Sequence, residues 1–149
     1  MFIDALLRVC NAQAFTAVAV STDSIDLGNV TPRREIAVGE PMGFGLSVGV
    51  AASSTTVLVE IIQATDGPLT AGIVVLSQRT FLAADLPVGA AVFMPLPQGV
   101  AVAGPLRFLG LRVTPVGGAA TVTLTAFLTA HNLFSIAARA YAKAFNVNS

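Results

Sequence analysis

The feature that most constrains the fold is a pair of alternating runs between Gly104 and Ala130, separated by a glycine-bearing turn. In the first run one set of side chains faces the other across the backbone: Arg107, Leu109, Leu111 and Val113 against Leu106, Phe108, Gly110, Arg112 and Thr114. In the second run the opposed sets are Val122, Leu124, Ala126 and Leu128 against Thr121, Thr123, Thr125, Phe127 and Thr129. A period of two is typical of half-buried β-strands. The break at residues 115–120 predicts that the two strands form a β-hairpin with a longer loop.

Shorter runs with strand character precede this stretch, and each is followed by turn residues. They are Phe15–Val20, Ser24–Leu27, Met42–Ala52, Thr56–Thr65, Ile73–Arg79 and Ala90–Leu96. With the two later runs this gives about eight strands and a turn signal roughly every eight to twelve residues, which predicts an all-β sandwich or barrel. Residues 80–89 are expected to be a connector, and 36–38 a short edge segment in a charged, exposed loop.

The strands define one domain with a flanking segment at each end. We expect residues 1–14 to be an N-terminal arm or first strand, 15–131 to be the β domain, and 132–149 to be a C-terminal tail. The tail is alanine-rich, which favours a short helix from about Ser135 to Ala144. An extended tail docked on a neighbouring molecule is the alternative.

The composition leaves this domain with more apolar surface than it can hide. Of 149 residues, 54% are hydrophobic and 11% are charged, against a usual charged fraction of about 25%. A small domain has too little interior for so much apolar surface, so an oligomer, a larger assembly or a membrane should cover part of it.

Three uncharged stretches are long enough to cross a membrane as helices, namely Pro41–Val59, Leu86–Leu106 and Thr114–Ala138. The second holds four prolines, which exclude a helix. The glycine, serine and threonine content of the first and the alternation of the third favour strands and loops instead. Asp4 and Arg8 interrupt the N-terminal segment, and no basic region precedes an apolar run there, so we expect no export signal and no membrane partner.

Charge and candidate side chains exclude several functions. The formal net charge is zero and no Lys/Arg run occurs, so nucleic-acid binding is not expected. The lone Cys10 should be a buried or interfacial small apolar residue rather than a nucleophile. The lone His131 should be a turn residue or an interface hydrogen bonder, and Asp23 and Asp26 should cap turns rather than hold calcium. We therefore expect no enzyme, no metal site and no cofactor.

Several segments together resemble the jelly-roll capsid cement, or decoration, proteins of short-tailed bacteriophages. They are STDSIDLG (21–28), GEPMGFGLSV (39–48), VLVEIIQATDG (57–67), LPVGAAVFMPLP (86–97), LRFLGLRVTPVGGAATVTLTAFLT (106–129) and the ending RAYAKAFNV (139–147). The resemblance covers about residues 2–130, and its motifs are structural rather than catalytic. The chain departs from the family in its glycine-rich strand at 42–50 and its alanine-rich C-terminus.

The resemblance implies a jelly-roll β-sandwich that sits on the outer surface of a virion and bridges subunits of the major capsid protein. It also implies a homo-oligomer, with a dimer favoured over a trimer. A lectin-like or host-recognition binding module is the alternative, but the chain has no Trp and only Tyr141 for sugar stacking. The candidate contact residues are Phe2, Ile3, Leu6, Leu7, Arg33, Arg34, Glu35, Arg112, Phe127, Phe134, Tyr141 and Phe145.

Overall fold

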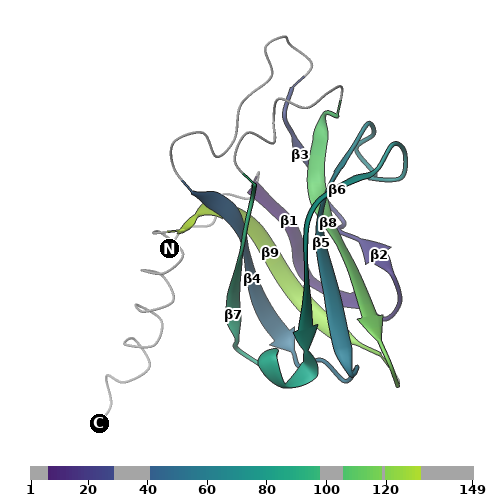
Figure 1. The fold of residues 1–149 in the computed structure, drawn as a ribbon, viewed down its shortest axis with the longest axis vertical. Helices are drawn as coiled ribbons and strands as arrows, with labels where there is room; N and C mark the ends of the chain where they lie inside the picture. Colours follow the sequence, from purple (N-terminus) through teal and green to yellow (C-terminus); the bar gives the residue numbers. More distant parts are fainter. Residues whose placement is uncertain (1–6, 29–40, 98–105, 119, 132–149) are drawn as a thin grey trace.

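The computed structural model describes residues 7–28, 41–97, 106–118 and 120–131, which form two β-sheets packed face to face (Figure 1). The elements are β1 (Arg8–Phe15), β2 (Ala19–Val20), β3 (Ile25–Asp26), β4 (Met42–Val50), β5 (Thr56–Ala64), β6 (Val74–Leu82), the 3₁₀ turn η2 (Ala83–Asp85), β7 (Ala91–Pro95), β8 (Phe108–Val116) and β9 (Val122–Ala130). All the strand pairs in these ranges are antiparallel.

The order of the strands is that of a jelly roll. One sheet has the order β1-β9-β4-β7, and the other has the order β2-β8-β5-β6, with β3 also pairing with β8. Because β2 and β3 both flank the same side of β8, the nine strands fill eight positions in two four-membered layers. The predicted all-β jelly-roll sandwich of about eight strands is confirmed.

The predicted hairpin is wrong. Strands β8 and β9 do not pair with each other: β8 lies between β2 and β5, whereas β9 lies between β1 and β4 in the opposite sheet (Figure 1). Gly117 and Gly118, both at positive φ, begin the connection that carries the chain across. Alternation shows that one face of each strand is buried, but it is satisfied equally by two strands of one sheet and by two strands that face each other.

The faces predicted for the two runs are confirmed. The core between the sheets takes Leu109, Leu111 and Val113 from β8 and Val122, Leu124, Ala126 and Leu128 from β9. Strands β4 and β5 add their own alternating sets, Phe44, Leu46 and Val48 and Val57, Val59 and Ile61. Phe15 and Phe81 are also fully buried there. Burying one large apolar side chain contributes about 1.5–3 kcal/mol, so these alternating faces hold the sheets together.

Two strand boundaries differ from the prediction. β6 continues to Leu82, three residues past the predicted end, because Phe81 fills the core and the turn comes only with η2, where the Leu82 N–H donates to Asp85 Oδ2 at 3.3 Å. The predicted strand 15–20 is interrupted, since β1 ends at Phe15 and β2 begins at Ala19. The predicted segment 36–38 and the tail lie outside the described residues. Within the described ranges, no helix is long and apolar enough to span a membrane.

Candidate functional site

Cys10 lies in the core and is not available as a nucleophile. It is 1% exposed, and its thiol donates to the carbonyl oxygen of Leu124 at 3.5 Å. Burial raises the pKa of this thiol to about 11, since the low-dielectric interior disfavours the thiolate. The prediction of a small buried apolar residue is confirmed.

His131 is exposed and directly follows β9. Its ring packs edge to face against the ring of Phe93, with centroids 4.8 Å apart. Its backbone N–H donates to the carbonyl oxygen of Pro41 at 2.9 Å. It therefore joins the ends of β9, β7 and β4. Among the described residues, no group of three or more His, Cys, Asp or Glu side chains is placed to bind a metal ion.

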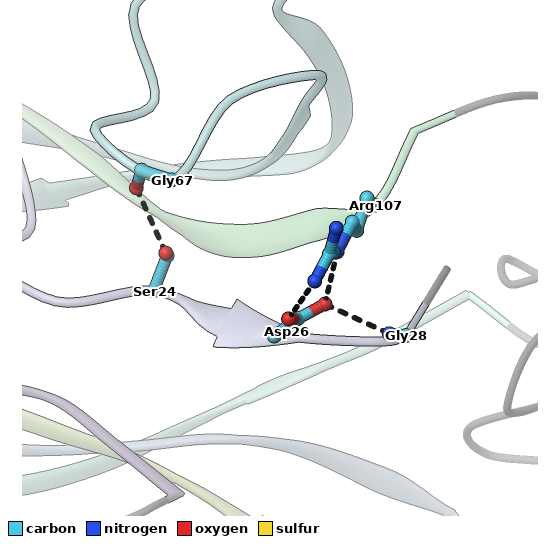
Figure 2. A network of polar contacts seen from close by, with 5 residues as sticks. All are labelled: Ser24, Asp26, Gly28, Gly67 and Arg107. Carbon is cyan, nitrogen blue, oxygen red and sulfur yellow. Dashed lines mark hydrogen bonds and ion pairs between the residues drawn. The ribbon is translucent and has the colours of Figure 1, made fainter. Parts of the chain in front are cut away.

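Ser24 and Asp26 together tie three segments to one another at one end of the sandwich (Figure 2). The Asp26 carboxylate accepts hydrogen bonds from the N–H of Gly28 at 2.8 Å and from Nε and Nη2 of Arg107 at 2.6 and 2.5 Å. Nearby, the Ser24 hydroxyl donates to the carbonyl oxygen of Gly67 at 2.8 Å. The predicted turn-capping role of Asp26 is confirmed, and the hydrogen bonds from Arg107 to Asp26 raise the pKa of Arg107. This cluster fixes β3 to the start of β8 and to the loop that follows β5.

Arg112 and Glu60 form an ion pair in the middle of the outer face of the five-stranded sheet. They lie directly opposite each other on β8 and β5, with Nε–Oε2 and Nη2–Oε1 distances of 2.6 and 2.9 Å. The Glu60 side chain is 8% exposed and that of Arg112 is 29% exposed. Hydrogen bonding to Glu60 raises the pKa of Arg112. The two hydrogen bonds fix the orientation of the guanidinium, so Arg112 is held by an interaction within its own chain.

A loop covers one end of this same outer face. After β5 the chain folds back so that Leu69, at 1% exposure, packs with Ile62 and Ala64 in a small second core. Asp66 holds the loop by accepting hydrogen bonds from the N–H groups of Thr70 and Ala71, both at 2.9 Å, and from the Thr70 hydroxyl. These bonds, the one from the Thr70 hydroxyl first, hold the pKa of Asp66 below its ordinary value.

Gly110 shows how closely this loop fits the sheet. A Cβ atom at Gly110 would lie 2.3 Å from Leu69 Cδ1 and 2.9 Å from Ser21 Oγ. From the sequence, only turn residues were predicted after the strand 56–65, and this cover was not. Two signals were present: the paired apolar residues Ile61 and Ile62, which break the alternation of β5, and a glycine on the outer side of β8.

The outer face of the four-stranded sheet is covered differently. β4 presents glycines there, and a Cβ atom at Gly43 would meet the ring of Phe93 at 2.8 Å and the main-chain oxygen of Met94 at 2.1 Å. Phe127, opposite Gly45 on β9, is only 6% exposed. The absence of a side chain at Gly43 is therefore what allows β7 to approach so closely.

The other end of the five-stranded sheet is left open. Leu82 of β6 and Val116 of β8 both lie opposite Thr56 of β5, so the three residues form one row on the outer face. Leu82 is 58% exposed and Val116 is 50% exposed. The next row is Thr80, Leu58 and Thr114. This apolar and threonine-rich surface was not predicted, because its residues come from three strands whose register the sequence does not reveal.

Of the twelve predicted contact residues, three lie in the described part of the chain. Leu7 is half-buried and packs against the core. Arg112 and Phe127 lie on the outer faces of different sheets and so belong to two separate surfaces. The other nine fall outside the described residues and stay predictions: Phe2, Ile3, Leu6, Arg33, Arg34, Glu35, Phe134, Tyr141 and Phe145.

Comparison with known proteins gives one informative result. The model of the family described as Bbp16 matches residues 9–133, which include all but the first residue of the nine strands. No curated protein matches the chain.

Proposed function

The chain belongs to the Bbp16 family of phage capsid cement proteins, and we propose that it sits on the outside of a bacteriophage head, bridges neighbouring major capsid protein subunits and stabilises the shell. The family consists of structural proteins of the phage particle, which implies a non-enzymatic role. The single observation that carries the proposal is the family match over residues 9–133.

The exposed apolar residues support a protein that works in an assembly. Even with the core filled, five large apolar side chains in the described part of the chain are half exposed or more: Val18, Val50, Leu82, Val88 and Val116. Apolar surface left open on a small domain is typical of an interaction site. Partners on a shell lattice would cover such surface and would stabilise the folded chain by mass action.

The sandwich and its flanking segments divide the work in this proposal. The sandwich is a rigid spacer, because its two sheets share one packed core. The N-terminal segment before β1, the loop 29–40 and the tail 133–149 make the contacts to the shell, whereas residues 8–14 of the predicted arm belong to β1 of the sandwich. Their apolar anchors are Phe2, Ile3, Leu6, Leu7, Phe134, Tyr141 and Phe145, and their polar contacts are Arg33, Arg34 and Glu35.

We also propose that the protein acts as a homo-oligomer. A dimer on two-fold positions of the shell is favoured, and a trimer on three-fold positions is the alternative. Each copy then contacts the shell at several points, so occupancy depends on the sum of the contacts rather than on any one of them.

The test is made on purified particles. Mass spectrometry should find the full chain in the particles, at a fixed copy ratio to the major capsid protein. Particles assembled with a chain lacking 133–149 should carry fewer copies and lose their DNA at a lower temperature than particles with the full chain. A chain that is absent from particles contradicts the proposed function. Unchanged occupancy with the truncated chain contradicts only the role of the tail.

A further inference from the structure

The four edges of the two sheets are not equally protected. The edge at β7 is short and ends at Pro95, and the edge formed by β2 and β3 consists of two two-residue pieces. Along β1 the register shifts twice, the Val9 carbonyl accepts the N–H of Asp23, and the Gln13 side chain bonds to Val20 and Thr22. Short length, proline, bulges and covering segments are the usual ways in which proteins prevent edge-to-edge pairing.

β6 has less of this protection. It is nine residues long, contains no proline and carries one charged side chain, Arg79. Its single irregularity lies near one end, between the pairs of Ile61 and Ile62, and Gln78, Arg79 and Thr80 are exposed. In the described part of the chain, β5 is the only strand that pairs with it.

The hydrogen bonds next to β6 show which of its backbone groups point outward. The N–H of Ala83 donates to the carbonyl oxygen of Thr55 at 3.1 Å, just beyond the opposed pair Leu82 and Thr56. In an antiparallel ladder this makes Leu82–Thr56 a pair without mutual hydrogen bonds. Since the register is regular from Leu82 to Ser77, Leu82, Thr80 and Gln78 direct their N–H and C=O groups away from β5. The Leu82 N–H already donates to Asp85 Oδ2 at 3.3 Å, so a partner strand would have to displace this one bond.

This edge is complementary to itself. Around a two-fold axis at Thr80, each Gln78 lies opposite Leu82 of the second copy, and each Arg79 lies opposite Phe81 of the second copy. No two arginines meet, and Arg79 already lies 4.6 Å above the ring of its own Phe81. The exposed apolar row of Leu82 and Val116 then continues into the row of Gln78, Glu60 and Arg112 of the second copy, so the two apolar rows lie on either side of the axis and do not face each other.

We propose that the chain forms a two-fold dimer in which residues 78–82 of β6 pair antiparallel with the same residues of a second copy, which joins the two five-stranded sheets into one. The inference rests on the proposed function for its dimer and names the edge that makes it. A second copy is favoured over a strand of another protein, because residues 78–82 place no two like charges opposite each other when they pair antiparallel with themselves.

The test compares two lysine variants of the full chain in solution. Thr80→Lys places two ammonium groups opposite each other at the axis. Thr114→Lys is the matched control, because Thr114 lies in the same outer-face row, opposite Leu58, but on the inner strand β8. By sedimentation equilibrium, the wild type and Thr114→Lys should be dimers with similar dissociation constants, whereas that of Thr80→Lys should rise at least tenfold. A monomeric wild type, or equal dissociation constants for all three chains, overturns the proposal.

A crosslink gives a second measurement that does not depend on destabilising the dimer. Cys10 is buried, so Thr80→Cys adds the one accessible thiol among the described residues, and mild oxidation should link two copies. Val18→Cys, at a 62% exposed position away from the edge, should link poorly. Equal linking of both variants overturns the proposal. Particles that carry Thr80→Lys at full occupancy without any Thr80→Cys crosslink would leave the proposed function standing and remove this dimer. A chain that crosslinks at Thr80→Cys but never enters particles would do the opposite.

Discussion

On each outer face of the sandwich a glycine is covered by a side chain, and the two covers come from different parts of the fold. On the four-stranded sheet, the Phe93 ring lies against the backbone at Gly43, so the cover comes from a neighbouring strand of the same sheet. On the five-stranded sheet, a separate loop folds back and sets Leu69 over Gly110. The atom nearest to a Cβ added at Gly43 is a main-chain oxygen, whereas the atom nearest to one added at Gly110 belongs to the Leu69 side chain.

This difference determines how each face responds to change. Main-chain atoms in a ladder cannot move without breaking hydrogen bonds, whereas the end of a leucine side chain can turn within its rotamers. Glycine is therefore more strictly required at Gly43 than at Gly110. The following predictions test that contrast, beginning with the largest expected effect.

Gly43→Ala should be the most damaging of the single substitutions. Its Cβ would lie 2.1 Å from the main-chain oxygen of Met94, which belongs to the β4–β7 ladder. We expect the free energy of unfolding to fall by about 3 kcal/mol or more, at the upper end of the range for overpacking. Urea unfolding followed by circular dichroism measures it. Gly49→Ala on the same strand is the control, since its nearest contact would be an ordinary 3.6 Å, and it should change stability by less than about 0.5 kcal/mol.

Leu69→Ala should lower the free energy of unfolding by about 2–4 kcal/mol, because it empties the small core over the five-stranded sheet. Gly110→Ala alone should lower it by about 1–2 kcal/mol through the clash with Leu69 Cδ1. In the double variant the new methyl group enters the space that the leucine left. The two losses should therefore sum to more than the loss of the double variant, and additive losses would contradict the contact.

Glu60→Gln should lower the free energy of unfolding by about 1–2 kcal/mol, because it leaves Arg112 partly buried without a carboxylate. The effect is discounted from that of a fully buried pair, since the Arg112 side chain is 29% exposed. Replacing both residues by leucine should restore most of the loss. If Glu60→Gln and the double variant are equally destabilised, the loss does not come from leaving Arg112 without a carboxylate.

The smallest expected effect is the pH dependence of the loop. The pKa of Asp66 is lowered in the folded chain from its ordinary value of 3.8. Its contribution to stability is thus complete above pH 3.8 and is lost as the pH falls through the lower, folded value. The difference in unfolding free energy between the wild type and Asp66→Asn should shrink as the pH is lowered from 6 to below 3.8. A constant difference across that range would mean that the charge of Asp66 plays no part.

The sequence predicted the features that depend on a single strand, such as which of its faces is buried. The alternation in β8 and β9 identified every core residue of those strands, and the family resemblance correctly indicated the jelly roll. The pairing of strands was not predictable in the same way, because Gly117 and Gly118 can begin a tight hairpin or a crossing between sheets. The distance between the two sheets is a property of the whole core, and no local residue encodes it.

The candidate contact surface was predicted less well for a related reason. Arg112 was identified from its strand, but its partner Glu60 is 52 residues away and became visible only through the register of β5 and β8. The row of Leu82 and Val116 was missed because each residue, taken alone, is an ordinary end of a strand. The cover by Leu69 was missed because its backbone, at φ +59, is one that leucine seldom adopts.

The position of β9 has a consequence for the time course of folding. It is the last of the described strands in the chain, yet it lies inside its sheet and pairs with β1 on one side and β4 on the other. Neither β1 nor β4 can complete its pairing until more than 120 residues have left the ribosome. Topologies dominated by such distant pairings fold slowly, because the entropy cost of closing a long loop comes before any stabilising contact forms. A nascent chain therefore exposes half-paired strands until β9 emerges, and every copy must complete that insertion before its sandwich closes.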